Sequence, residues 1–230
     1  MNTFSNFKKI KNIIITGGLG FIGSNFITHI FSKYDYNIIN VDSETYAANT
    51  ENIPNNISDS SRYFFAKSDI NNTNDMRYLV NQNSVNYIVN FAAESHVDNS
   101  INNSSPFIHT NINGTHSLLN LLHDCPSIER YLQVSTDEVY GSLTEDEDAF
   151  TENTPIQANS PYSASKASAD LLCRSFYETF NYPILITRCS NNYGPNQHEE
   201  KLIPLMIKNA KAGKKLPVYG DGKNIRDWIH

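Results

Sequence analysis

The sequence has few cysteines, no block of positive charge and no long apolar run. Its three cysteines, Cys125, Cys173 and Cys189, form no CxxC pair, so neither a disulfide framework nor a zinc site is expected. The net charge is −6 and the lysines and arginines are not clustered, which argues against a nucleic-acid partner. No apolar stretch approaches the roughly 20 residues that cross a membrane. These absences predict a protein of the reducing cytoplasm, with no metal centre and no membrane partner.

The apolar residues form short runs separated by longer segments with a helical pattern. The chain has 230 residues, 39% of them hydrophobic, which is enough to form the core of one domain. Most runs are continuous rather than alternating, as is typical of parallel strands covered on both faces. Strands are expected at residues 11–17, 36–42, 62–69, 85–92, 130–136 and 182–188. Helices are expected at residues 21–33, 73–82, 106–123 and 161–181. This order predicts an α/β fold with a Rossmann-type, doubly wound parallel sheet.

Three glycines follow the first predicted strand, in the stretch "TGGLGFIGS". Structural turns also use glycine, but a GxxGxxG pattern between a strand and a helix is the setting of a dinucleotide fingerprint. Gly17 permits the tight turn, Gly20 lets the backbone approach a pyrophosphate, and Gly23 lets helix and strand pack closely. The helix N-terminus then faces the phosphates.

A carboxylate ends the next predicted strand. Asp42 lies nineteen residues after Gly23, where it can bind the ribose hydroxyls of adenosine and repel a 2′-phosphate. This favours NAD over NADP. Asp42 alone is equally well explained as a helix cap, but the glycines at this distance favour the cofactor. Asp69, at the end of the third strand, can similarly reach the adenine.

The stretch "SPYSASKASAD" places Tyr162 and Lys166 four residues apart, on one face of a helix. A tyrosine near its usual pKa of about 10 is a poor base at neutral pH. A nearby ammonium and a positive nicotinamide ring favour the phenolate, so the pair can take a proton from an alcohol while hydride leaves. Such a pair is also common on solvated helices, and only the glycine fingerprint favours the catalytic interpretation.

Together these features resemble the extended branch of the short-chain dehydrogenase/reductase superfamily, which works on nucleotide sugars. Nearly the whole chain resembles the dTDP-glucose 4,6-dehydratases. The similar stretches include "ITGGLGFIGSNF", "VDSETYAANTENI", "FAAESHVDNSI", "VSTDEVYG", "SPYSASKASAD", "TRCSNNYGP", "EKLIPLMI" and "NIRDWIH". Sister epimerases share the glycines and the tyrosine–lysine pair, but they have no need of the two adjacent acids in "STDEVYG".

The resemblance implies a hydro-lyase that converts dTDP-glucose, or UDP-glucose, to the 4-keto-6-deoxy sugar for deoxysugar biosynthesis. As C4 is oxidised by NAD, Tyr162 takes the hydroxyl proton and Thr136 hydrogen-bonds the same oxygen, with Lys166 beside them. Glu138 then removes the C5 proton, Asp137 protonates the departing C6 hydroxyl, and hydride returns to C6. Burial and mutual repulsion can separate the pKa values of two such acids. The downstream sugar, rhamnose or an amino sugar, stays open.

The resemblance also implies binding residues and a homodimer formed through helices 106–123 and 161–181. The further cofactor contacts would be Phe21, Ile22, Asp42, Ser43, Thr45, Asp69, Ile70, Phe91, Ala92, Ala93, Thr110, Tyr162, Lys166 and Asn192. The nucleotide sugar would contact Ser95, Thr136, Asn191, Lys201, Leu202, Pro217, Tyr219 and Arg226. Arg226 has an alternative interpretation as a surface ion pair with Asp221 or Asp227, and His96 is interpreted as structural.

Two features depart from the family pattern. The stretch "GPNQHEEKL" lacks the usual aromatic residue after the proline, so Asn196, Gln197 and His198 are expected to alter how the nucleotide is held. The sequence also stops at His230, inside a segment that continues in relatives. We expect residues 1–190 to form the NAD-binding domain with the catalytic residues, and 191–230 to begin a substrate-binding lobe. Two alternatives stay open, a nucleotide-sugar 4-epimerase and a catalytically idle subunit for sugar-nucleotide binding or assembly.

Overall fold

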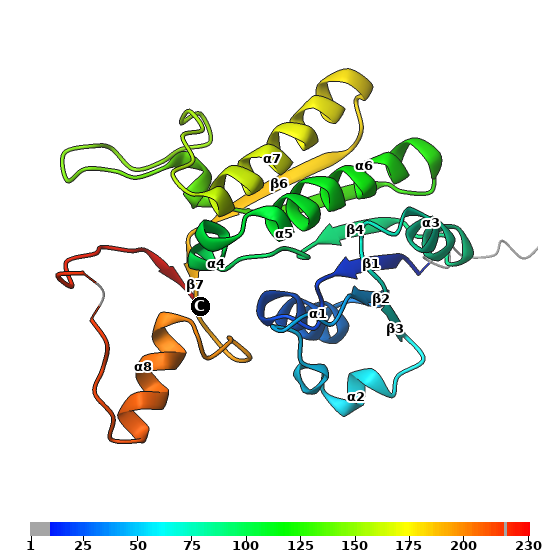
Figure 1. Cartoon of the computed structure of the whole chain (residues 1–230). Helices are drawn as coiled ribbons and strands as arrows, with labels where there is room; N and C mark the ends of the chain where they lie inside the picture. Colours follow the sequence, from blue (N-terminus) through cyan, green and yellow to red (C-terminus); the bar gives the residue numbers. More distant parts are fainter. Residues whose placement is uncertain (1–9, 219) are drawn as a thin grey trace, which may run out of the picture.

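A six-stranded parallel sheet forms the centre of the protein in the computed structural model, which describes residues 10–218 and 220–230 (Figure 1). Its strands are β1 (Asn12–Thr16), β2 (Asn37–Asp42), β3 (Tyr63–Lys67), β4 (Tyr87–Asn90), β5 (Arg130–Thr136) and β6 (Ile184–Cys189). Their order is β3-β2-β1-β4-β5-β6, so the direction of winding reverses between β1 and β4. The predicted doubly wound sheet is therefore confirmed, and this reversal is where such sheets bind ligands.

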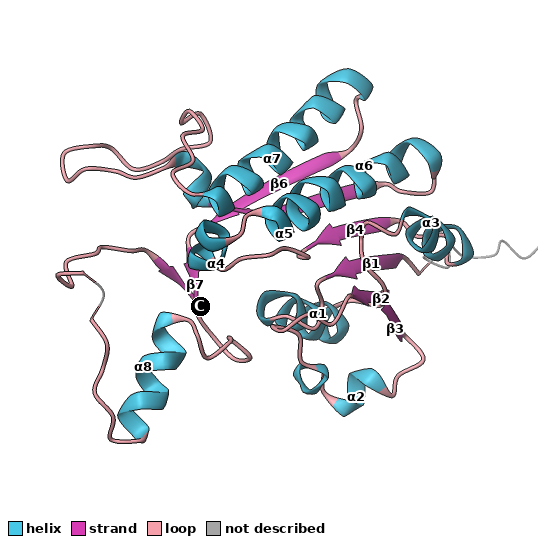
Figure 2. Ribbon diagram, in the orientation of Figure 1, coloured by secondary structure: helices cyan, strands magenta, loops and turns pink. Residues whose placement is uncertain are grey.

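Helices cover both faces of the sheet (Figure 2). The long helices packed on the sheet are α1 (Phe21–Lys33), α3 (Thr73–Gln82), α6 (Thr115–Asp124) and α7 (Pro161–Phe180), whereas α8 (Leu202–Lys211) lies away from it (Figure 1). Shorter helical turns are η1 (Thr50–Asn52), α2 (Asn55–Ser58), α4 (Val97–Asn102), α5 (Ser105–Phe107), η2 (Ile108–Gly114) and η3 (Asp137–Tyr140). Strands β7 (Asn191–Asn192) and β8 (Trp228–Ile229) form a separate parallel pair. The assignment of residues 191–230 to a second lobe stays a prediction.

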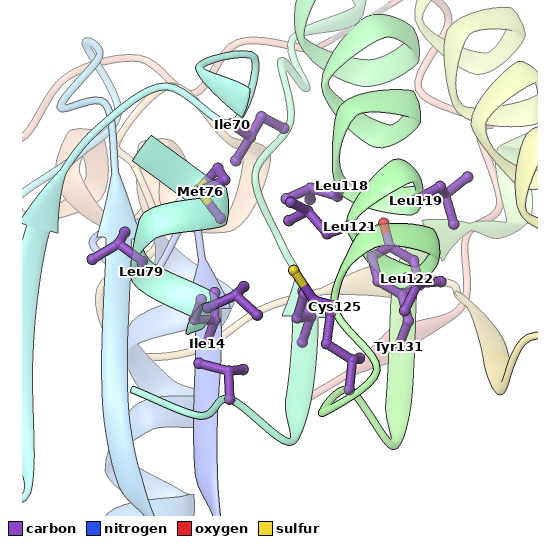
Figure 3. Packing of buried hydrophobic residues seen from close by; sticks show 14 of the residues in the cluster. Ile14, Ile70, Met76, Leu79, Leu118, Leu119, Leu121, Leu122, Cys125 and Tyr131 are labelled. Carbon is purple, nitrogen blue, oxygen red and sulfur yellow. The ribbon is translucent and has the colours of Figure 1, made fainter. Parts of the chain in front are cut away.

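The alternation of side chains along β1 divides the core into two layers. Ile14 lies in a cluster with residues of α3, α6 and α7 (Figure 3), whereas Ile13 and Ile15 pack with residues of α1 and α2. All three isoleucines are at most 3% exposed. Since each buried aliphatic side chain contributes about 1.5–3 kcal/mol, the two layers fix β1 at the centre of the sheet. The glycine turn that follows β1 is thereby held rigidly.

The single helix predicted over 106–123 is divided in the structure. A π-helical turn, η2, separates α5 from α6. Within it, the buried Asn111 side chain donates to the Glu94 carbonyl (3.0 Å) and the Ser165 hydroxyl (2.8 Å) and accepts from the Glu94 amide (2.9 Å). At Gly114, an added Cβ would lie 2.4 Å from Ile70 Cδ1, so the turn packs tightly against the loop after β3. These tertiary contacts explain why a widened turn interrupts the regular helix.

Among the described residues, no helix has both the length and the apolar character needed to cross a membrane.

Candidate active site

A cavity of about 410 Å³ lies where the parallel strands end. It is lined by the turn after β1 and by residues at or just after the ends of β2, β3, β4, β5 and β6. Sixteen of the residues predicted to contact the cofactor line it: Gly17, Gly20, Phe21, Ile22, Gly23, Asp42, Ser43, Thr45, Asp69, Ile70, Phe91, Ala92, Ala93, Thr110, Lys166 and Asn192. Tyr162 is the predicted cofactor contact outside this lining.

The glycine turn has the close approaches that the sequence predicts. Gly17 has a φ of +67°, and an added Cβ would lie 2.7 Å from the Ala92 backbone nitrogen. An added Cβ at Gly23 would lie 2.3 Å from the Gly17 carbonyl oxygen. At Gly20 the nearest atom would be 3.3 Å away, so the chain itself leaves that face open. Gly17 and Gly23 are therefore required by packing, whereas Gly20 leaves space suited to a ligand phosphate.

The Asp42 carboxylate is held at the end of β2 by backbone donors. Oδ2 accepts from the Leu19 amide (3.0 Å) and Oδ1 from the Glu44 amide (2.9 Å). Burial raises the pKa of Asp42, and these two hydrogen bonds oppose the rise. Each carboxylate oxygen keeps a further lone pair, so both can still accept from a ribose diol. This geometry fits the predicted role of Asp42 as a ligand of the ribose. Through its hydrogen bond with the Leu19 amide, Asp42 also connects the glycine turn to the end of β2.

The three residues Thr136, Asp137 and Glu138 lie where β5 ends and η3 begins. Thr136 is the N-cap of η3: its hydroxyl accepts from the Glu138 amide (3.2 Å) and donates to Asp137 Oδ1 (3.3 Å). Capping by a threonine explains why the strand ends here in a tight turn. The Ser163 hydroxyl on α7 donates to Glu138 Oε2 (3.1 Å), which links the acid pair to the helix of the tyrosine and lysine.

Helix α7 begins at Pro161, after its N-cap Ser160, and carries Tyr162 and Lys166. The Ser160 hydroxyl caps the Ser163 amide (3.1 Å), and Pro161 occupies the first helical position. The Tyr162 amide donates to the Ser100 hydroxyl (3.1 Å), while Lys166 Nζ reaches across to the Val134 carbonyl on β5 (2.7 Å). Lys166 is 5% exposed, so its ammonium is held inside the protein at the end of the cavity.

The expected lowering of the Tyr162 pKa by Lys166 is not found. Burial, followed by the charge of Glu138, raises the pKa of Tyr162 well above its usual value, while the Thr136 hydroxyl has a lowering effect. Lys166 instead directs its ammonium to the Val134 carbonyl. The fold therefore places Thr136, Asp137, Glu138 and Tyr162 near one another, as predicted. The surroundings of Tyr162, however, favour its neutral phenol over the phenolate.

Asp137 is half-buried, and its surroundings favour the neutral carboxyl. Burial raises the pKa of Asp137, and its hydrogen bond with Thr136 and the charge of Arg226 oppose the rise. The direction agrees with the predicted role of a proton donor. Among the described residues, the Arg226 side chain donates to the Ile225 carbonyl (2.8 Å), and the predicted alternative pairing with Asp221 or Asp227 is not seen.

The predicted substrate residues are distributed unevenly around the cavity. Ser95, Asn191, Lys201 and Leu202 line it, whereas Thr136, Pro217 and Arg226 do not; Tyr219 lies outside the described residues. Lys201 Nζ donates to the Ser95 carbonyl (3.3 Å), which joins the start of α8 to the loop after β4. Their contacts with a substrate stay predictions.

Some cavity residues were not predicted from the sequence. They include Ser68, Glu94, Val134, Ser135, Cys189, Glu200 and Trp228. All of these except Ser68 stand within stretches that resemble the family, so they could have been found there. His96 caps α4 by accepting from the Asn99 amide (3.4 Å) and faces Glu200 (3.7 Å), which agrees with a structural role. Asn196, Gln197 and His198, which depart from the family pattern, also line the cavity.

Proteins with similar sequences match most of the chain. The low-salt glycan biosynthesis protein Agl12 of Haloferax volcanii is 48% identical over 219 residues, which are 95% of this chain and 69% of that protein. The dTDP-glucose 4,6-dehydratase of Neisseria gonorrhoeae is 47% identical over 227 residues, 95% of this chain and 65% of that enzyme. The chain thus spans about two thirds of the length of these relatives.

Solved structures and a family model agree with this relationship. The dTDP-glucose 4,6-dehydratase of Bacillus anthracis in complex with NAD superposes with a TM-score of 0.88 at 51% identity, over 96% of this chain and 67% of that one. DesIV, the dTDP-glucose 4,6-dehydratase of Streptomyces venezuelae with NAD and TYD bound, gives a TM-score of 0.90 at 44% identity, over 95% and 68%. A family model described as GDP-mannose 4,6 dehydratase matches residues 14–230. The chain therefore belongs to this family of nucleotide-sugar dehydratases.

Proposed function

We propose that the protein is an NAD-dependent nucleotide-sugar 4,6-dehydratase, a lyase that removes water from dTDP-glucose. The observation that carries this proposal is the acid pair Asp137 and Glu138 beside Thr136 and Tyr162, at the end of the strand next to the cavity. Simple oxidation or 4-epimerisation needs the tyrosine and lysine but not the two acids. The identities with named dTDP-glucose 4,6-dehydratases support the same conclusion.

NAD fits the residues that line the cavity. Gly20 leaves space at the N-terminus of α1, where backbone amides suit a pyrophosphate, and Asp42 presents carboxylate oxygens for a ribose. When bound, NAD supplies the acceptor for the hydride of C4, the donor that returns it to C6, and a positive charge near the reacting groups. Asp42 would repel the 2′-phosphate of NADP, which supports NAD as the cofactor.

We assign each proton transfer of the reaction to a different residue of the chain. Tyr162 takes the proton of the C4 hydroxyl, and Thr136 holds that oxygen by a hydrogen bond. The resulting 4-keto group makes the C5 proton acidic, and Glu138 removes it. Asp137, which burial favours in the neutral form, gives its proton to the C6 oxygen, so water leaves and a C5–C6 double bond forms. A proton on C5 and the returned hydride on C6 complete the 4-keto-6-deoxy sugar.

The reaction can be tested directly with the full-length protein, NAD and two candidate sugars. Incubation with dTDP-glucose is expected to remove one water, which mass spectrometry detects, and UDP-glucose tests whether the nucleotide is selected. A sugar that keeps its mass but changes configuration at C4 would instead identify an epimerase. Binding without any turnover would identify a subunit that only holds the sugar nucleotide. Thermal stabilisation by each sugar ranks their affinities independently of turnover.

We also propose that the protein forms a homodimer through residues 106–123 and α7. Leu171 on α7 is 53% exposed and Ile108 in η2 is 49% exposed, so both segments keep apolar surface for a second copy. Sedimentation equilibrium is expected to give twice the chain mass. Replacing Leu171 by Glu should shift the protein toward the monomer; a parent protein that is already monomeric at micromolar concentration would contradict the dimer.

A further inference from the structure

A row of chemically active side chains continues beyond the tyrosine and lysine of α7. Asp170 follows Lys166 by four residues, as Lys166 follows Tyr162, so the three side chains share one face of the helix. Lys166 is 5% exposed and Asp170 only 1%. Two opposite charges are thus buried one helical turn apart, directly behind the cavity. A buried charge without a partner is strongly unfavourable, so this placement calls for a physical explanation.

A third charge holds Asp170 from the neighbouring strand. Arg188 on β6 donates from Nε to Asp170 Oδ2 (2.7 Å) and from Nη1 to the Tyr140 hydroxyl (2.8 Å). Tyr140 ends η3, the turn that carries the acid pair. The guanidinium therefore connects α7, β6 and η3, and it occupies only one of the two oxygens of Asp170. Among the described residues, the other oxygen, Oδ1, has no hydrogen-bond partner although it is buried.

We propose that Asp170 is a positioning residue for the reaction: held by Arg188 one helical turn behind Lys166, it keeps the buried Lys166 ammonium charged. The inference rests on the proposed function for the use of Lys166, but not for the interaction itself. Asp170 is not among the described residues that line the cavity, so we place it out of contact with substrate and cofactor. It acts through Lys166, whose own hydrogen bond goes to the Val134 carbonyl on β5.

The electrostatic surroundings of Lys166 support this role. Burial lowers the pKa of Lys166, and the carboxylate of Asp170 is the largest opposing influence, ahead of Cys189 on β6 and Cys173 on α7. Burial likewise raises the pKa of Asp170, and the Arg188 guanidinium opposes the rise. Arg188 thus favours the ionised carboxylate, and the carboxylate favours the ammonium. Burial raises the pKa of the Cys173 thiol to about 12, so this group gives Lys166 no equivalent support.

A purely structural role is the competing interpretation. The Arg188–Asp170 pair would then only fasten α7 to β6, and a neutral amide that keeps the hydrogen bond would serve equally well. Asp170→Asn separates the two, because it removes the charge and keeps nearly the same shape. Asp170→Glu restores the charge. Glu178→Gln is the matched control, since it removes an exposed carboxylate of the same helix, 3.4 Å from Arg174.

The titration of Lys166 in the protein without cofactor or substrate measures the effect. Lysine labelled with ¹³C at Cε gives a resonance that reports the charge of each ammonium, and Lys166→Arg assigns the one concerned. In Asp170→Asn, the pH at the midpoint of the Lys166 titration is expected to be lower than in the parent protein. Asp170→Glu should recover at least part of the fall, and Glu178→Gln should leave the midpoint unchanged. An unchanged midpoint in a folded Asp170→Asn protein would overturn the proposal.

The double variant Asp170→Asn/Arg188→Gln covers the case in which the single variant fails to fold. It leaves no unpaired guanidinium in the interior, and Lys166 still loses its carboxylate. In this double variant the titration midpoint of Lys166 should also move to lower pH. A midpoint equal to that of the parent protein would refute the role of Asp170. Because no substrate is present, failure of this test is distinct from failure of the dehydratase proposal, which product analysis decides. In the active enzyme, Asp170→Asn is further expected to shift the alkaline limit of C4 oxidation to lower pH.

Discussion

Gly23→Ala places a methyl group where the backbone leaves no room for one. Its Cβ would lie 2.3 Å from the Gly17 carbonyl oxygen and 2.8 Å from Gly18 Cα. Both are backbone atoms, so α1 itself must move, and the upper end of the overpacking range, about 3 kcal/mol, applies. The better helix propensity of alanine offsets about 1 kcal/mol of this. We expect a net loss of about 2 kcal/mol in the free energy of unfolding, or about 4–8 °C in melting temperature for a chain of this size.

Gly20→Ala provides the contrast, since its Cβ would meet only the Gly17 carbonyl oxygen, at 3.3 Å, and its φ of −76° suits any residue. Its loss of stability should stay below about 1 kcal/mol, while its affinity for NAD falls because the methyl group points into the space proposed for the pyrophosphate. His29→Ala, an exposed position on α1, is the control for both. Thermal denaturation by circular dichroism and titration calorimetry with NAD measure the two quantities. A Gly23→Ala protein that melts with the parent would refute the packing argument.

The remaining predictions concern carboxylates. Asp137→Asn with Glu138→Gln should preserve oxidation at C4 but slow water loss by about 10²–10⁴-fold, seen as accumulated reduced-nicotinamide absorbance; dehydration at the parental rate would exclude the acid pair. Because burial raises the pKa of Asp137 and only the neutral acid donates, the elimination rate should fall as pH rises through that pKa, and Asp137→Asn should abolish this limb. For Asp42 the folded pKa is raised, so its contribution to stability should decrease as pH rises from the unfolded toward the folded pKa. Denaturant titrations of Asp42→Asn should show a flatter profile in the pH range just above the usual pKa of an aspartate, and an unchanged slope would contradict the raised pKa.

The sheet and the glycine turn could be predicted from the sequence because their causes are local. Helix α1 spans Phe21–Lys33 and β5 spans Arg130–Thr136, as the patterns indicate. Strand ends are less accurate: β4 covers Tyr87–Asn90, where the apolar run suggests 85–92. Apolar residues continue past the last ladder hydrogen bond there, since the chain after β4 lines the cavity. Apolar residues in a sequence show which part of the chain is buried, whereas the length of a strand depends on its hydrogen bonds with the neighbouring strand.

The division of the helix over 106–123 and the state of Tyr162 could not be predicted in the same way. Asn111 disturbs the helix only because Glu94 and Ser165, distant in sequence, present partners for its side chain. The pKa of Tyr162 likewise depends on burial and on Glu138, which another element contributes. The motifs indicate which residues to consider, but a motif alone cannot give the balance of desolvation and charge at each one.

The balance of burial and charge at Tyr162 and Asp137 favours one order of steps in the proposed reaction. Burial acts on Tyr162 and Asp137 in the same direction, raising both pKa values, with opposite consequences for their roles. Asp137 needs its proton to act as the acid, and burial favours that form. Tyr162 must lose its proton to act as the base, and because Glu138 makes this harder, a further positive charge entering the site favours that role. A cationic cofactor supplies this charge and a neutral one does not. Oxidation at C4 is thus favoured in the loaded enzyme, and the elimination that depends on the 4-keto group cannot precede it.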